Sequence, residues 1–478
     1  MKKLLVALGI LAALLVLAGV AVLVLVDVNA YKPRIESGVS EALGMEFKIH
    51  GKGRLRFFPS ASIVLSDVRL RNRGTDLAAA EALRVGVKLL PLLSRQVVIT
   101  ELALEKPVIR IEKGIEGKFN YETAPSPVTK EGEAPPAPMV ISAGSVSAGK
   151  IVYVDRKSES ETSLDAIDLY VRDLSIPTAS GVKLSKGISF SGDLSAKEMK
   201  TKDFTVSDVR AKVTARAGVY EIRPFTMKLF GGAGEGGIRV DLSGKTPALK
   251  VNYTLAKFRA EESLAGLAQE KYLSGPMTVT PDLSAQGKDV DGMKRTLSGT
   301  VSLRGDGLSF HGMEIDKTLS KAEEARNLGL ADVGAFVLAG PLGSAALRGY
   351  RYGDLYRSAT RERETRIPRL VSDWTVRNGV ADARDVAFST GKNRIALKGK
   401  LDLVNGRFVD VTVAALDGKG CAKIRQKISG SFGDPRMDKT SFLQSFADPI
   451  LGTFHRTGNL LGISACDPFY TGAVRHPN

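Results

Sequence analysis

Residues 249–255 read LKVNYTL, and this short alternation decides the fold of the chain. Apolar side chains occupy every second position, and polar residues stand between them. Because successive side chains of a β-strand point to opposite faces of its sheet, a period of two predicts a strand with one apolar face. The same alternation recurs at 238–242, 395–403 and 409–413. The chain is therefore predicted to be mainly β, with a large antiparallel body whose sheet faces water on one side.

Helices are expected to be few and short. The candidates are residues 31–45, 259–272, 316–328 and 441–454. Gly44 suits the end of the first of them. Residues 76–90 combine a helix-like stretch, LAAAEAL, with a strand-like RVGVKLL.

Residues 124–138, APSPVTKEGEAPPAP, contain five prolines and no large apolar residue. This composition is typical of a linker or a long solvated loop. It divides the body into predicted parts. These are an anchor at 1–30, a β domain at 31–123, the linker at 124–138, a middle β region at 139–260 and a C-terminal β region at 261–478.

The N-terminus carries a membrane signal. Lys2 and Lys3 precede 23 uncharged, apolar residues from Leu4 to Val26. As a helix this run is about 34 Å long, enough to cross a hydrocarbon core of about 30 Å. A cleaved signal peptide, ending at Val28-Asn29-Ala30, is the alternative, but its apolar stretch is normally shorter. The length favours a retained transmembrane anchor with the lysines on the cytoplasmic side and the body exported.

The chain is basic, with a formal net charge of +16 and a pI near 9.6. Export disfavours nucleic acid as the partner, and the charge is spread along the chain. Only residues 361–369, RERETRIPR, are dense in charge. A solvated strand face or loop is the favoured interpretation of this stretch, and attraction to anionic lipid headgroups is the alternative.

Two cysteines, Cys421 and Cys466, are present. An even cysteine count in an exported protein favours a disulfide. The bridge would close a loop of about 45 residues and stabilise the fold by about 3–4 kcal/mol. A reactive thiol is the weaker alternative, because neither cysteine lies in a CxxC pair.

The sequence contains no complete catalytic or metal-binding signature. The four histidines are scattered, and HExxH, GxSxG and Walker A sequences are absent. Gly232, Gly234 and Gly237 match GxGxxG, but a strand pattern follows them where a dinucleotide site needs a helix. We expect these glycines to form a hairpin turn, and Asp373 and Asp385 to be turn residues. The chain is thus predicted to be no enzyme and to hold no cofactor or metal.

Several segments, in this order, resemble the AsmA family. They are FFPSASIVLSDVRLRN at 57–72, the run from Leu83 to Glu122, LSGTVSLRGDGLSFHGMEID at 297–316, residues 374–403, ISGSFGDPRM at 428–437 and the late Cys466-Asp467-Pro468-Phe469-Tyr470. No single motif carries the resemblance; the ordered combination does.

The resemblance implies a single-pass inner-membrane protein, anchored by residues 4–26, with a periplasmic body in Gram-negative bacteria. It implies a curved, open β-sheet similar to chorein-type, bridge-like lipid-transfer proteins, and a role in phospholipid transport and outer-membrane biogenesis. Phospholipid and envelope proteins are the implied partners. The residues that we expect to line an apolar groove, or to pack its floor, are Val251, Tyr253, Leu255, Ile395, Leu397, Val411 and Val413.

A different class of function remains open at this point. The apolar faces can instead be sealed in a dry core, as in an envelope assembly scaffold that binds proteins and regulates outer-membrane protein assembly without carrying lipid. Sequence does not separate a groove from a core, because both need strands with one apolar face.

Overall fold

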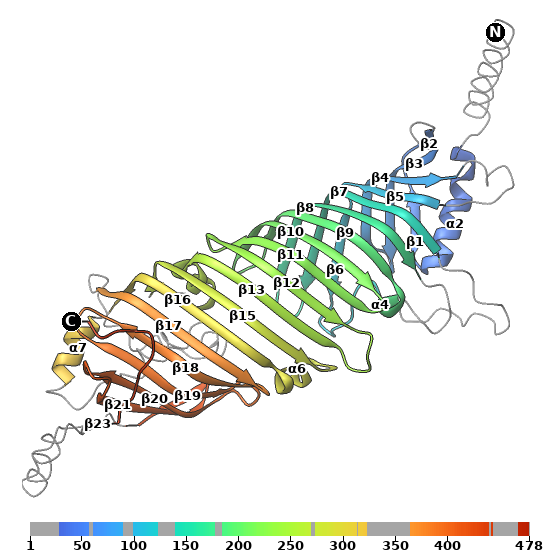
Figure 1. The fold of residues 1–478 in the computed structure, drawn as a ribbon. Helices are drawn as coiled ribbons and strands as arrows, with labels where there is room; N and C mark the ends of the chain where they lie inside the picture. Colours follow the sequence, from blue (N-terminus) through green and yellow to red (C-terminus); the bar gives the residue numbers. More distant parts are fainter. Residues whose placement is uncertain are drawn as a thin grey trace, which may run out of the picture. The chain divides into compact units, whose positions relative to one another are not determined.

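The computed structural model describes residues 28–56, 61–88, 99–122, 139–176, 184–268, 273–312, 314–322, 364–438, 441–442 and 467–477. The described chain is mainly β, as expected (Figure 1). It divides into two compact units. Unit 1 holds residues up to 202 and 207–218, and unit 2 holds 203–206 and the residues from 219 onward. The division falls inside the predicted middle region.

The described part of unit 1 contains a short helical entry followed by strands β1 to β10, of which β10 has its first two residues in unit 2. Its elements are η1 (Val28–Tyr31), α2 (Lys32–Leu43), β1 (Glu46–Ile49), β2 (Gly53–Arg56), β3 (Ser62–Asn72), β4 (Thr75–Val87), β5 (Ile99–Glu105), β6 (Val108–Lys113), β7 (Met139–Asp155), β8 (Ser160–Ile176), α4 (Leu184–Gly187), β9 (Ser189–Lys200) and β10 (Thr205–Arg216).

The strands of unit 1 pair mostly with their neighbours in sequence. Strands β1 and β2 both pair with β3, and antiparallel pairings then join β3 to β4, β7 to β8 and β8 to β9. Strands β5 and β6 lie side by side with β4, each along a different part of it. The strands of unit 1 thus lie in the sheet largely in chain order.

One pairing departs from the predicted antiparallel sheet. Strand β7 runs parallel to both β5 and β6. A parallel neighbour needs a long crossover, because the chain must return to the same end of the sheet. Residues 114–138, which include the proline-rich segment, make this connection. The chain on either side of that segment therefore belongs to one sheet.

The first described residues dock on unit 1. Asn29 Oδ1 accepts a hydrogen bond of 2.9 Å from the Gly53 N–H of β2, and Val28 is buried. Helix α2 follows and packs Ile35 and Val39 against the core of β1–β4. It ends as predicted at Gly44, whose φ of 63° is left-handed and costs glycine little.

Unit 2 contains the remaining strands. Its elements are β11 (Val219–Leu229), β12 (Gly232–Asp241), β13 (Ala248–Arg259), α5 (Ala260–Ala268), β14 (Leu273–Ser274), β15 (Pro276–Gln286), α6 (Val290–Thr296), β16 (Ser298–His311), α7 (Ile315–Ala322), β17 (Glu364–Arg377), β18 (Val380–Ser389), β19 (Arg394–Asp402), β20 (Arg407–Leu416), β21 (Ala422–Ser431), β22 (Asp434–Met437) and β23 (Ser441–Phe442).

The sheet of unit 2 is antiparallel throughout its described pairings, from β11 to β23. Short hairpins connect several strands. At Phe230-Gly231 and Asn378-Gly379 both residues have positive φ, the geometry of a two-residue turn whose twist matches the flanking strands.

The helix predictions are only partly confirmed. Helices α2 and α5 lie within two of the expected ranges, and α7 occupies the start of the third, whose end lies outside the described residues. The reading of LAAAEAL as helix-like is wrong, because these residues lie in β4. Their alanines pair with β3 and β6, so sheet pairing overrides alanine's helix propensity.

The predicted anchor at residues 4–26 lies outside the described residues. None of the helices that the structure describes combines the length and apolar character that a membrane crossing requires.

Candidate functional site

Two continuous rows of apolar residues cross one face of unit 1. Strand register places the members of each row opposite one another, from β2 to β9. The first row consists of Leu55, Ile63, Val85, Leu102, Gly144, Val171 and Gly192. The second row consists of Gly53, Leu65, Leu83, Leu104, Val146, Leu169 and Leu194. Cross-strand neighbours of this kind touch, so the rows form an apolar strip on the sheet.

The strip is not fully buried. At the β1–β4 end it belongs to a core that α2 covers, and Leu65 there is only 3% exposed. Farther along, Leu104, Val146, Leu169 and Leu194 are half-buried. Over β5–β9 the strip therefore leaves aliphatic surface in contact with solvent. In an ordinary sheet, packing against another layer would bury this surface.

The opposite face of unit 1 is polar. Tyr170, beside Leu169, is 45% exposed. Arg172 forms an ion pair of 2.7 Å with Asp193 on the next strand, and Arg84 forms one of 2.9 Å with Glu105. Exposed pairs stabilise little, but they keep this face wetted, so the two faces of the sheet differ sharply in polarity.

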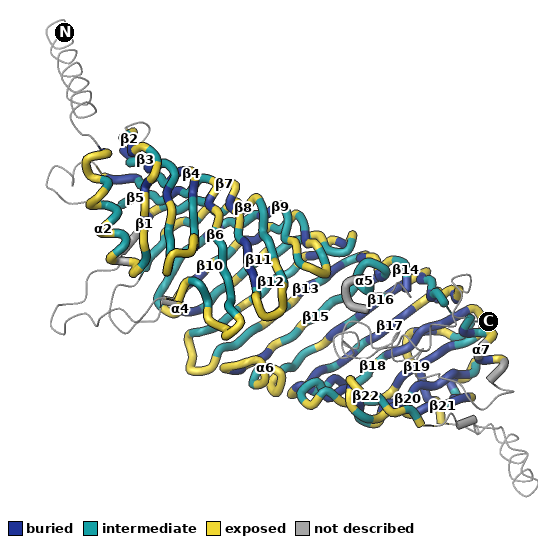
Figure 2. Tube along the Cα trace, turned by 180° about the vertical axis from the view of Figure 1, so that it is seen from behind, coloured by how far each residue is buried: buried dark blue, intermediate teal, exposed yellow. Residues whose placement is uncertain are grey.

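Unit 2 continues the alternation with a row of its own. Register connects Ile222, Ile238, Val251, Leu283, Gly299, Val376, Ala381, Leu401 and Phe408, from β11 to β20. The burial of its members increases along the row. Its members on β11, β12, β13 and β15 are half-buried, whereas Val376, Ala381 and Leu401 are at most 1% exposed. Figure 2 shows the buried positions gathered over β16–β21.

The structure brings the seven predicted groove residues together on this one face. Six are buried members of a single apolar cluster, and Val251 packs half-buried against it. Ile395 and Val413 are 0% exposed, and Tyr253 and Leu255 retain 9% and 7%. On β19 and β20 these side chains therefore pack as a core, while β13 lies where the face is still partly open. Their role in lining a groove stays a prediction.

Both faces of β17–β21 are covered. A second cluster holds small residues of the other face, such as Ala387, Ala396 and Ala414, under Phe469, Tyr470 and Val474. We call residues 467–477 the C-terminal strap. Sequence reasoning missed this contact, since strap and strands are far apart in the chain, although the late Cys-Asp-Pro-Phe-Tyr was noted.

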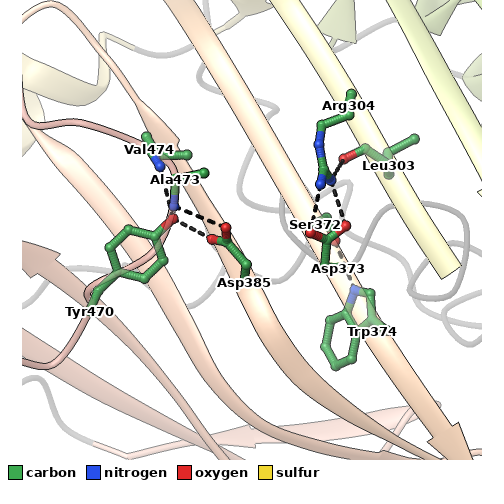
Figure 3. A network of polar contacts seen from close by, with 9 residues as sticks. All are labelled: Leu303, Arg304, Ser372, Asp373, Trp374, Asp385, Tyr470, Ala473 and Val474. Atoms are coloured by element: carbon green, nitrogen blue, oxygen red, sulfur yellow. Dashed lines mark hydrogen bonds and ion pairs between the residues drawn. The ribbon is translucent and has the colours of Figure 1, made fainter. Parts of the chain in front are cut away.

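Hydrogen bonds fix the strap to the strands (Figure 3). The Tyr470 hydroxyl donates to Asp385 Oδ1, and Asp385 Oδ2 accepts from the Ala473 N–H at 2.9 Å. The Val474 N–H donates back to the Tyr470 oxygen at 3.0 Å. The Arg394 guanidinium lies 5.4 Å from the Tyr470 ring centre. Burial raises the pKa of the Tyr470 hydroxyl well above its ordinary value, so it remains a donor.

Asp373 and Asp385 lie in strands β17 and β18, so their prediction as turn residues is wrong. Asp373 forms a bidentate ion pair with Arg304 of β16 at 2.5 and 2.6 Å (Figure 3). These hydrogen bonds raise the pKa of the Arg304 guanidinium. Asp373 thus joins β17 to β16, and Asp385 joins β18 to the C-terminal strap.

The chain matches a known protein family over most of its length. The model of the AsmA family matches residues 1–205 and again 189–386. The chain belongs to the AsmA family. No match to the chain was found among curated proteins or among solved structures.

The glycine-rich motif of this AsmA-family chain is part of a strand. Gly232, Gly234 and Gly237 lie in β12, and the turn before it uses Phe230-Gly231. The prediction that these glycines themselves form the turn is wrong. Strand β13 follows, so no helix N-terminus is present to hold a pyrophosphate. Among the described residues no group of metal-ligating side chains gathers.

The dense basic stretch at 361–369 is described from Glu364 onward. There Arg366 and Arg369 are exposed on β17 while Thr365 and Ile367 are buried. This part of the stretch is the solvated strand face that the sequence favours.

The cysteine bridge is consistent with the strap but stays a prediction. The Phe469 and Tyr470 N–H groups both donate to the Gly420 carbonyl, at 2.8 and 3.3 Å. The chain just after Cys466 thus meets the residue before Cys421. No described cysteine is a free thiol, but Cys466 lies outside the described residues.

Proposed function

We propose that this AsmA-family chain is a single-pass inner-membrane protein whose periplasmic body handles phospholipid between the inner and outer membranes and so supports outer-membrane biogenesis. The lipid would lay its acyl chains on the apolar strip and keep its headgroup in water. The action is binding and guidance, without catalysis.

The observation that carries the proposal is the half-buried apolar strip of β5–β9. Aliphatic side chains that remain partly exposed along a continuous row are costly in water and are stabilised by an apolar ligand. Acyl chains fit such a row, because the attraction is non-directional and needs no polar partner. The strip also begins beside residues 28–29, which lie at the end of the predicted anchor, just after its apolar run at 4–26.

The second candidate function is that of a protein-binding scaffold. The C-terminal strands of unit 2 favour it. There both faces are covered, so β17–β21 offer no comparable open strip. An envelope protein would then bind this closed region, and lipid would be absent from the whole body.

A charge placed in the strip tests the lipid proposal. Leu169→Asp should reduce the phospholipid that co-purifies with the full chain by at least about tenfold, because an acyl chain cannot solvate a carboxylate. Lipid held by the anchor is subtracted before the comparison. Tyr170→Asp is the matched control, since Tyr170 is the next residue on the polar face. Lipid is measured by mass spectrometry of organic extracts.

Equal lipid in both variants and in the wild type would contradict the proposal. A wild-type body that retains no phospholipid would favour the scaffold.

A further inference from the structure

Three glycines leave one part of the apolar face without side chains. Gly232, Gly234 and Gly236 occupy alternate positions of β12, and register places Gly236 beside Tyr253. A Cβ atom at Gly234 would lie 2.8 Å from Tyr253 Cε1, and one at Gly236 would lie 2.7 Å from Tyr253 Cδ2. The tyrosine ring therefore lies across the glycines, in space that any other residue on β12 would fill.

The Tyr253 ring is well packed but its hydroxyl is not satisfied. The ring centre lies 5.5 Å from that of Phe225, and the residue is 9% exposed. The hydroxyl oxygen is buried and has no hydrogen-bond partner among the residues that the structure describes. A phenylalanine would fill the same space without the desolvation cost of the hydroxyl, so packing alone does not account for a tyrosine here.

The surroundings determine what kind of group can pair with this hydroxyl. Burial raises the pKa of Tyr253 to about 12, so the group stays a neutral donor at physiological pH. The Tyr253 ring lies over Gly234, and strand register places Met227 and Leu255 on either side of that glycine. The charged residues of the same strands, such as Glu235 and Lys250, alternate onto the opposite face and are exposed.

An anionic acceptor is therefore disfavoured. A phosphate or carboxylate at this point would be buried with no counter-charge among the described residues of the face, which is far costlier than burying a neutral carbonyl. An ester carbonyl oxygen is a neutral acceptor, and it is attached directly to an acyl chain.

We propose that the Tyr253 hydroxyl donates a hydrogen bond to an ester carbonyl oxygen of an acylglycerol lipid lying on the apolar face of β11–β13. The inference rests on the proposed function, since it assumes that lipid occupies this face. It adds a specific polar contact to an otherwise non-directional surface, and it selects lipids with ester-linked chains over those with ether-linked chains.

The test compares two phosphatidylglycerols with equal chains, one ester-linked and one ether-linked, offered to the full chain in an equal mixture. The ratio of bound ester lipid to bound ether lipid should be about threefold to tenfold higher for the wild type than for Tyr253→Phe. This is the range expected for one net hydrogen bond. Tyr253→Phe should still bind both lipids. Tyr170→Phe, which changes an exposed tyrosine, should behave as the wild type.

A second readout reports the bond itself. With ¹³C in the ester carbonyls, the wild type should show an infrared carbonyl band at lower frequency than Tyr253→Phe does. Without lipid, Tyr253→Phe should be at least as stable to heat as the wild type. If the wild type binds both lipids equally and its carbonyl band matches that of Tyr253→Phe, the inference fails while lipid handling stands. If the wild type binds neither lipid, both fail.

Discussion

Val413→Asp is expected to destabilise unit 2 by about 4 kcal/mol at pH 7, the cost of keeping protonated a carboxyl whose unfolded pKa is about 3.9, and this is a large part of a typical domain's stability. Val413 is 0% exposed and lies between Leu397 and Gln426 in the apolar cluster. Burial raises the pKa of a carboxyl group at this position by about 3–5 units, so the group stays largely protonated in the folded state. The chain's one tryptophan, Trp374, is 2% exposed in the same cluster and reports unfolding in urea.

The pH dependence follows from the sign of this shift. A carboxyl whose pKa is higher in the folded state costs nothing below its unfolded pKa, because both states are then protonated. The destabilisation should therefore shrink as the pH falls toward about 4. Thr412→Asp is the matched control, since Thr412 faces the other way between Lys398 and Lys427. Equal stability of the two variants at pH 7 would show that the cluster is not a packed core.

Tyr470→Ala is expected to detach the C-terminal strap and to cost about 3–5 kcal/mol. The substitution removes a buried ring from the cluster over Ala387, Ala396 and Ala414, together with the hydroxyl that joins Asp385 to Val474. Limited proteolysis of the full chain under reducing conditions should then release residues from the strap. Under these conditions the predicted cysteine bridge cannot hold it in place.

Tyr470→Phe separates packing from hydrogen bonding. It keeps the ring but leaves the Asp385 carboxylate and the Val474 N–H with one partner fewer, so a smaller loss of about 1–3 kcal/mol is expected. A strap that resists protease equally in the wild type and in Tyr470→Ala would refute the view that this tyrosine anchors it.

The strands could be predicted from the sequence because their signal is local. The alternation in LKVNYTL is read within seven residues, and Gly44 marks the end of a helix by its own backbone preference. The alanine-rich LAAAEAL was ambiguous because helix propensity and sheet pairing compete, and the partner strands are not visible in the local pattern.

Contacts between distant segments could not be predicted in this way. The parallel pairing of β7 with β5 and β6 depends on the return of the chain over residues 114–138. Tyr253 was singled out as a groove residue, but its position over the β12 glycines follows from register, which alternation does not specify. The degree of burial that separates Val251 from Val413 likewise depends on what lies above the sheet.

Photo-crosslinking in cells tests most directly the central claim, that the half-buried apolar positions of β5–β9 in unit 1 and of β11–β15 in unit 2 carry lipid. A photoreactive residue is placed at Leu169 of unit 1 or at Val251 of unit 2, and for comparison at the exposed residue that follows each in its strand, Tyr170 or Asn252. The account predicts phospholipid adducts at Leu169 and Val251 and none at Tyr170 and Asn252. Absence of lipid adducts at both apolar positions, with or without crosslinks to protein, would contradict it.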